Sequence, residues 1–469
     1  MANISEDGDF SKDKLLLDPK KAGIVDLILL LCSPDIKKRN FIDCPEEDRR
    51  RDFNRRWLIF VSVVVQKLLI YSRKPLARLG DAFEMWLNLV SSNGGLFLLL
   101  VNSIRGTVVR PDRWTATFQS SANNLDVRVE LDGEFKPGHR KYIASLSFMA
   151  AKLSYENEAR IKSIVQDHWH MELLGDYSFW NEYQQRASTK AFILQNTKTD
   201  PNLVVVAFRG TDTFDADSWC TDVDLSWYEI DNIGKIHRGF MKALGLQKNG
   251  WPKEVPQDSD HLYAYYTIRE KLREVTYNNR NARIVITGHS LGGALAVLCV
   301  AVLAMHDEAE LLQKLEGVYT FGQPRVGDGQ FGKFMEEKME EYDVRYSRFV
   351  YCNDMVPRLP FDDKTMLYKH FGPCLFYNSC YKGQVLTEEP NKNYFNPLWA
   401  IPKYLNAIWE LVRSFIIPYT KGPDYRESWF MTLFRVVGLV IPGLSAHLHQ
   451  DYDNATRSAS LPESASASR

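Results

Sequence analysis

Residues 288–292, Gly-His-Ser-Leu-Gly, carry the clearest chemical signal in this chain of 469 residues. They follow an apolar, β-branched run at residues 284–287 and precede a run of small and apolar residues, a pattern that predicts a strand, a sharp turn and a helix. A G-x-S-x-G turn in that setting holds its serine on a strained backbone with Oγ exposed for attack. We therefore expect Ser290 to be a nucleophile, against the alternative of a surface serine in a glycine-rich turn.

A serine nucleophile needs a histidine base and an acid that orients the base. In a site of this type the acid follows the nucleophile along the chain and the histidine comes last. Asp354 fits the acid because it follows the apolar run 348–351, where a strand would end. Three histidines come after it, and His370 follows too closely to leave room for another element. Spacing does not decide between His447 and His449.

Stabilisation of an oxyanion needs two backbone N–H donors. One is expected from Leu291, the residue after the nucleophile. The other should come from a loop after an earlier strand, and residues 204–208 (Val-Val-Val-Ala-Phe) predict such a strand. Gly210 then permits an unusual turn that points the N–H of Thr211 into the site. The alternative is an ordinary turn at the end of a strand.

These elements together resemble the class 3 (fungal-type) triacylglycerol lipases. Five segments carry the resemblance: Phe208-Arg209-Gly210-Thr211, His237-Arg238-Gly239-Phe240, Gly288-His289-Ser290-Leu291-Gly292-Gly293, Thr320-Phe321-Gly322-Gln323-Pro324-Arg325-Val326-Gly327 and Asn353-Asp354-Met355-Val356-Pro357-Arg358-Leu359-Pro360. Within that family, the apolar N-terminal extension, residues 214–222 and a Trp-rich insertion resemble the plant oil-body lipases.

The resemblance implies an α/β-hydrolase fold, a triad of Ser290, Asp354 and a C-terminal histidine, and an oxyanion hole of Thr211 and Leu291. In the plant lipases the histidine lies four residues before an Asp-Tyr pair, which here selects His447. The segment after Thr211, residues 212–222, would be a lid. Its Phe214 and Trp219 would cover the site in water and move away at a lipid surface, which gives interfacial activation.

Composition narrows the class of protein. Hydrophobic residues make up 45% of the chain, aromatic residues 12%, and the formal net charge is -1. A charge near zero argues against nucleic acid as the main partner. The seven cysteines are odd in number and lack metal-ligand spacing, and no apolar signal segment is visible near residue 1. We expect free thiols, with a Cys374–Cys380 pair as the alternative, a reducing cytosolic compartment, and no metal or organic cofactor.

The pattern divides the chain into four parts. These are a mobile polar tail (1–23), an apolar and amphipathic extension (24–134), an α/β-hydrolase lipase domain (135–455) with an amphipathic insertion (394–442), and a disordered tail (456–469). Within the domain, helices are expected at 142–155, 261–274 and 294–305, and strands at 191–194, 203–208, 284–287, 318–321 and 348–351. This alternation predicts a mostly parallel central sheet.

The extension and the insertion both carry unusual apolar sequence. Two runs, 57–71 and 86–101, are separated by Arg73-Lys74-Pro75, and each is broken too early for a clean membrane span. We interpret them as a hydrophobic hairpin at a lipid surface, with Arg55, Arg56, Arg73 and Lys74 at headgroup level, and buried core helices as the alternative. In the insertion, helical spacing predicts two amphipathic helices separated by Pro418 and Pro423, either packed in the core or facing lipid.

The function that follows is a serine ester hydrolase that releases fatty acids from triacylglycerol, and from di- and monoacylglycerol, at a lipid-droplet surface. It would bind the droplet monolayer or a membrane peripherally or monotopically, on the cytosolic side, and a homo-oligomer is left open. One alternative is an A1-type phospholipase or galactolipase with the same mechanism. The other is a non-catalytic, lipase-like scaffold protein.

Overall fold

The strand β5 (Leu203–Phe208) shows why the centre of this protein is a sheet covered on both faces. Its sequence is apolar throughout and all of its residues are buried. Side chains alternate between the two faces of a strand, so an uninterrupted apolar strand needs cover on both sides. Val204 and Val206 pack into one apolar core, whereas Val205 and Ala207 pack into another. The sheet therefore lies between two layers of helices.

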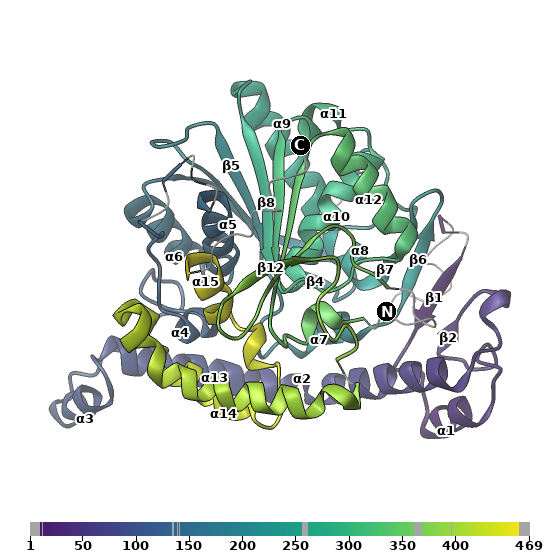
Figure 1. The fold of residues 1–469 in the computed structure, drawn as a ribbon, viewed down its shortest axis with the longest axis horizontal. Coiled ribbons are helices and arrows are strands. Elements are labelled where there is room, and N and C mark those ends of the chain that lie inside the picture. The colour runs from purple at the N-terminus through teal and green to yellow at the C-terminus, as the bar shows by residue number, and fades with distance from the viewer. Residues whose placement is uncertain are drawn as a thin grey trace.

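The structure is a computed structural model that describes residues 10–11, 13–133, 136–137, 139, 141–255, 261–360, 368–394 and 396–458. Its main sheet has eight strands in the order β12-β11-β10-β9-β8-β5-β4-β3 (Figure 1). The five strands β11, β10, β9, β8 and β5 run parallel to one another. At the two edges β12 is antiparallel to β11, β4 is antiparallel to β5, and β3 is antiparallel to β4. Their bounds are β3 (Glu172–Asn181), β4 (Arg186–Gln195), β8 (Arg283–His289), β9 (Leu315–Phe321), β10 (Arg345–Tyr351), β11 (Cys374–Tyr377) and β12 (Gly383–Leu386). The expected α/β class with a mostly parallel central sheet is confirmed.

Helices cover the two faces of this sheet unequally. The larger core is formed with α8 (Arg238–Leu244), α9 (Ala264–Asn278), α10 (Leu291–Met305) and α12 (Gly329–Glu341). The second core is formed with α5 (Tyr142–Leu153), α6 (Glu158–Ser163) and α15 (His449–Ser458). The helix α10 is buried along nearly its whole length because its sequence is apolar on every side. All seven cysteines are free thiols, so Cys374 and Cys380 are not paired.

The N-terminal region differs from the expected tail. Residues Lys14–Leu17 form β1, which lies between β2 (Ile42–Asp43) and β6 (Trp227–Ile230) in a second, four-stranded sheet completed by β7 (Gly234–His237). Leu15 and Leu16 are fully buried, and this burial fixes the segment. The expectation of a mobile tail over 1–23 is thus wrong for this strand, and residues 1–9 lie outside the described residues. At the other end α15 reaches Ser458, and 459–469 lie outside the described residues.

A single helix of 40 residues, α2 (Phe53–Ser92), replaces the two separate apolar runs expected in the extension. Pro75 lies inside this helix. A proline removes one helical hydrogen bond and here leaves the carbonyl of Tyr71 without its N–H donor. The helix tolerates this loss because Tyr71 is exposed. After two glycines with positive φ, Gly94 and Gly95, α3 (Leu96–Arg105) follows. In the described part of the chain no single helix has the length and apolar character to cross a membrane, whereas α2 and α3 together do, with an 80° bend between them.

Two of the four basic residues expected at headgroup level are buried instead. Arg55 pairs with Asp48, and Arg56 donates to carbonyl groups, including that of Leu30, in and just after α1 (Ile24–Cys32). These partners tie the start of α2 to α1 and to the turn that ends at Asp48. Arg73 and Lys74, in the middle of the helix, are exposed as expected.

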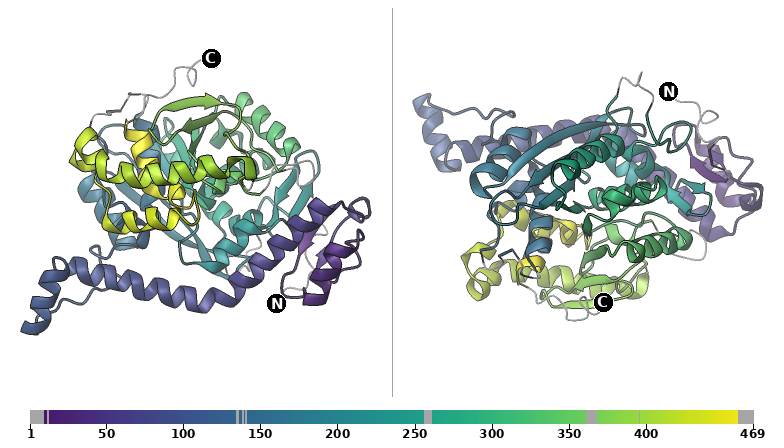
Figure 2. Two further views of the ribbon diagram at one scale, coloured as in Figure 1. Left: turned by 60° about the horizontal axis from the view of Figure 1, so that its bottom comes forward. Right: turned by 90° about the horizontal axis from the view of Figure 1, so that it is seen from above.

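The insertion forms α13 (Ala400–Lys421) and α14 (Trp429–Gly438), and α13 continues through Pro418 and ends at Gly422. Both helices lie along the same side of the molecule as α2 (Figures 1 and 2). Their outward side chains are apolar and exposed: Ile401, Leu405, Ile408, Val412, Phe415, Leu433 and Val436, as is Val440 just after α14. On the opposite faces, Ile417 of α13 and Phe430 and Met431 of α14 are buried and pack against the rest of the protein. The insertion thus presents an apolar face outward.

Candidate active site

The turn between β8 and α10 places Ser290 in a strained conformation. Its φ of 57° and ψ of −132° are sparsely populated by residues with side chains. The turn is tight because backbone packs on backbone. A Cβ on Gly288 would lie 2.2 Å from the carbonyl carbon of Gly292, and one on Gly292 would lie 2.3 Å from the carbonyl oxygen of Phe208. Only glycine fits both positions, and this turn brings Ser290 to the ends of the central strands.

The structure brings three of the expected residues into one hydrogen-bonded line. Ser290 Oγ lies 2.8 Å from His447 Nε2, and His447 Nδ1 lies 2.8 Å from Asp354 Oδ2. A carboxylate can only accept, so Nδ1–H donates to Asp354 and Nε2 is free to accept the serine proton. Ser290 and His447 are buried and Asp354 is fully buried. This arrangement can activate a serine for attack on a carbonyl group.

Asp354 has two further donors that hold its carboxylate. Tyr452 Oη donates to Oδ2 at 2.6 Å, and the N–H of Val356 donates to Oδ1 at 2.9 Å. Both bonds fix the carboxylate in the orientation in which Oδ2 also accepts from His447 Nδ1. The contact of Tyr452 with the acid was not inferred from the sequence, although the Asp-Tyr pair after the histidine was the signal that singled it out.

The structure separates the three candidate histidines. His449 is buried beside Tyr155 and His289, with ring centroids 4.7 and 4.4 Å away, and neither of its ring nitrogens has a hydrogen-bond partner among the described residues. Burial, followed by the charge of Lys152, lowers the pKa of His449 to about 3. His370 Nε2 donates to the carbonyl of Pro357. Of the three, His447 is the one that contacts Ser290 Oγ.

A second, neutral histidine supports the loop that carries His447. His289, inside the turn itself, donates from Nε2 to the carbonyl of His447 at 2.9 Å, and its Nδ1 accepts from Tyr155 Oη at 3.1 Å. Burial, followed by the charge of His449, lowers the pKa of His289 well below its usual value. It therefore stays uncharged and can donate with one nitrogen and accept with the other. Sequence reasoning did not find this role, because it depends on contacts more than 130 residues apart.

The expected oxyanion donors lie on both sides of the nucleophile. Leu291 is the first residue of α10, so its N–H has no partner four residues earlier in the helix. The loop with Thr211 lies against the turn, since a Cβ on Gly210 would be 2.3 Å from the carbonyl oxygen of His289 and 3.0 Å from Ser290 Cβ. Thr211 Oγ1 donates to Asp222 Oδ2 at 2.8 Å, and burial raises the pKa of Asp222 to about 7. Asp222 is a second residue whose contact was not inferred from the sequence.

The lid segment expected after Thr211 forms the short helix α7 (Ala216–Val223), capped by Asp215. Phe214 and Trp219 are half-buried, and Trp219 Nε1 donates to the carbonyl of Thr213. The helix lies between the ends of the central strands and α2 (Figure 1). Only 1% of Ser290 is exposed. The site is therefore closed.

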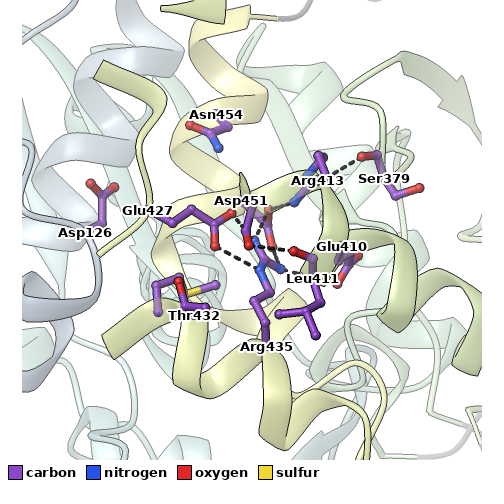
Figure 3. A network of polar contacts seen from close by, with 12 residues as sticks. Asp126, Ser379, Glu410, Leu411, Arg413, Glu427, Thr432, Arg435, Asp451 and Asn454 are labelled. Carbon is purple, nitrogen blue, oxygen red and sulfur yellow. Dashed lines mark hydrogen bonds and ion pairs between the residues drawn. The ribbon is translucent and has the colours of Figure 1, made fainter. Parts of the chain in front are cut away.

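A buried ionic network connects the insertion to the segment that carries His447 (Figure 3). Asp451 in α15 accepts from Arg435 of α14 at 2.7 and 2.9 Å and from Arg413 of α13 at 2.7 Å. Glu427 and Glu410 also pair with Arg435. Burial alone would raise the pKa of Asp451, but the two guanidinium groups hold it below its usual value. Unpaired, such a charge would be strongly destabilising, so α13, α14 and α15 are held together.

Comparison with known proteins gives consistent matches. The family model described as lipase (class 3) matches residues 205–364. Triacylglycerol lipase OBL1 of Arabidopsis thaliana is 40% identical over an alignment 490 positions long, which covers 94% of this chain and 94% of that protein. The OBL1 lipase of Nicotiana tabacum is 40% identical and covers 86% of this chain and 83% of its own. The native lipase–propeptide complex of Rhizomucor miehei, a solved structure, is 21% identical, covers 56% of this chain and 80% of its own, and has a TM-score of 0.39.

The hydroxyl of Tyr452 offers a direct test of the geometry around Asp354. Tyr452→Phe removes one hydrogen bond to the acid and should slow the reaction of Ser290 with a serine-directed phosphonate probe about tenfold, the equivalent of ~1.4 kcal/mol. Tyr377→Phe is the matched control, because Tyr377 is equally buried and its hydroxyl has no hydrogen-bond partner among the described residues. Equal labelling rates in both variants, at equal melting temperature, would contradict a role for this bond.

Proposed function

Because this chain belongs to the class 3 lipase family, we propose that it is a triacylglycerol lipase in which Ser290, His447 and Asp354 form the catalytic triad. The hydrogen-bonded line from Ser290 through His447 to Asp354 carries this proposal. The choice of substrate is supported by the relatives at 40% identity over most of both chains, which are triacylglycerol lipases by name.

The geometry gives each group a role in ester hydrolysis. Ser290 Oγ attacks the ester carbonyl carbon while His447 Nε2 takes its proton. The N–H groups of Thr211 and Leu291 stabilise the negative oxygen of the tetrahedral intermediate. His447 then gives the proton to the departing glycerol hydroxyl, which leaves an acyl-enzyme. Water, deprotonated by His447, attacks the acyl group and releases the fatty acid and Ser290.

Asp354 acts through His447 without becoming protonated. Its hydrogen bond fixes the ring with Nδ1–H toward the acid and stabilises the imidazolium that forms in each half of the reaction. Val356 and Tyr452 hold the carboxylate in that orientation. His289 holds the backbone carbonyl of His447 from the other side. The imidazole is therefore positioned before substrate arrives.

The lipid-facing part of the proposal rests on the apolar face formed by α3, α13 and α14. Its most exposed side chains include Ile104 of α3 and Tyr419 of α13, at 87% and 90% exposure, and Leu398, just before α13, is 84% exposed. Large exposed apolar patches of this kind mark binding surfaces. Triacylglycerol is insoluble in water and collects in droplets, so an enzyme that consumes it must work at a lipid surface. We infer that this face rests on the monolayer of a lipid droplet.

A triolein emulsion tests the reaction and the base together. The wild type should release oleate, and Ser290→Ala and His447→Ala should each lower the rate by about 10⁴-fold or more. His449→Ala is the matched control and should keep the rate within about tenfold, since its ring nitrogens make no hydrogen bond to any described residue.

Other results would overturn parts of the proposal. Full activity in His447→Ala with loss in His449→Ala would move the base. A wild type that hydrolyses phosphatidylcholine vesicles or galactolipid but not triolein would indicate a phospholipase or galactolipase. Probe labelling without turnover of any of these esters would refute the enzyme assignment.

The lipid-facing surface can be tested by flotation with triolein droplets coated with phosphatidylcholine. Leu405, Ile408 and Val412 are outward residues of α13, exposed by 62%, 51% and 44%. Replacing the three by serine should reduce the bound fraction at least about tenfold, because their apolar area no longer leaves water. Leu262→Ser with Tyr277→Ser changes exposed apolar residues at α9 and is the control. Equal flotation of both variants would contradict this surface.

A further inference from the structure

The long helix α2 lies along the whole length of the lid helix α7. Contacts between them run in opposite directions along the two helices, so that rising residue numbers on α2 meet falling numbers on α7. Ser62 Oγ donates to the carbonyl of Val223 at 2.7 Å. Further along come Cys220 Sγ with the carbonyl of Gln66 at 3.7 Å, and Arg73 with Asp217 at 3.7 Å. The series ends where Gly80 meets Phe214, just before α7 begins.

These contacts come from one stripe of α2. At about 100° per residue, positions 62, 66, 73 and 80 fall within about 40° of each other around the helix. The closest approach is at Gly80, where a Cβ would lie 2.6 Å from Phe214 Cβ. A glycine therefore permits α2 and the lid segment to meet without a side chain between them. One face of α2 is thus fitted to the lid.

The opposite face of α2 is apolar and exposed. Tyr71 and Leu68 are 77% and 63% exposed, and the same face carries Phe53, Trp57, Leu79 and Trp86. These six residues fall about 180–260° around the helix from Ser62. The exposed basic residues Lys74 and Arg78 lie beside this stripe, where they can meet lipid phosphates. The helix α2 lies on the same side of the molecule as α13 and α14, whose outward side chains are also apolar (Figures 1 and 2).

Aromatic rings join α2 to both the lid segment and the insertion. The ring centroid of Phe83 lies 6.3 Å from that of Phe214 and 4.8 Å from that of Phe430. The ring centroids of Trp86 and Trp429 are 5.7 Å apart. Leu448, the residue after the proposed base, packs in the same cluster as Phe430. In water, the hydrophobic effect holds such rings together. Against lipid chains that driving force is lost, because the chains are as apolar as the rings.

We propose that α2 is a latch that holds the lid closed, and that binding of the outer face of α2 to a lipid surface releases the lid. This inference rests on the proposed function and adds the way in which the site is regulated. Lipid favours the open state for a physical reason: opening exposes Phe83, Phe214 and Trp86, which costs free energy in water and little in lipid. The lid α7 therefore opens when α2 parts from it.

A disulfide between the latch and the lid segment tests this directly. Gly80→Cys with Phe214→Cys removes the ring and leaves two Cβ positions that need a shift of only about an ångström to reach disulfide spacing. Replacing the exposed Cys32 and Cys380 by serine prevents other cross-links. Oxidised with glutathione disulfide, with the bond verified by mass spectrometry, the enzyme should hydrolyse triolein at least tenfold more slowly than the same sample after reduction. An unchanged rate in the cross-linked form would overturn the latch.

A second variant opens the latch instead of locking it. Gly80→Leu places a side chain against Phe214 and should raise hydrolysis of dissolved p-nitrophenyl butyrate, without any lipid surface, at least threefold over wild type. Ala77→Leu adds the same bulk at an exposed position of α2 and is the matched control. No increase in a folded Gly80→Leu protein would also count against the latch. If the wild type and the reduced double-cysteine variant cleave neither ester, the proposed function fails instead.

Discussion

Close backbone packing at three glycines is the constraint on which the rest of this structure depends. Gly288 and Gly292 let β8, α10 and the end of β5 approach more closely than any side chain would allow, and Gly210 lets the next loop rest on the same turn. This packing holds Ser290, the start of α10 at Leu291 and the loop that carries Thr211 against one another. The acid then comes to that point from the end of β10, and the histidine comes from the short turn just before α15.

The histidine is held by elements that also face outward. His289 and Tyr155 fix its backbone, Tyr452 fixes its acid, and Asp451 pins the same segment to Arg413 and Arg435 of the insertion. A buried charge network of this kind makes α13, α14 and α15 one body. The apolar face proposed to meet lipid is therefore built on the same helices that position the catalytic groups. The helix α7, with α2 packed against it, lies on that side and is proposed to cover the site.

Much of the site could be predicted because its signals are local. The turn around Ser290, the strand before Thr211 and the strand before Asp354 each show in a few consecutive residues, and the structure places all three beside one another. The choice between His447 and His449 was not local, because two residues of separation leave both near the site and only packing distinguishes them. The contacts of His289 and Tyr155 depend on partners more than 130 residues away, so the residues themselves gave no pattern.

The same distinction applies to the fold. The alternation of helices and strands in the catalytic part is visible in hydrophobic periodicity, whereas β1 is a short strand buried by partners about 25 and 210 residues away. The continuity of α2 through Pro75 could not be read from a rule that prolines break helices, since the helix is held along its length by α7 and its neighbours.

The central claim is that Ser290 is covered in water and uncovered at a lipid surface, and the rate of tributyrin hydrolysis across its solubility limit tests this most directly. If the open state is about 0.1–10% populated in water, the rate per enzyme should rise tenfold or more once droplets form. A rate that saturates with dissolved tributyrin and does not change when droplets appear would contradict the account.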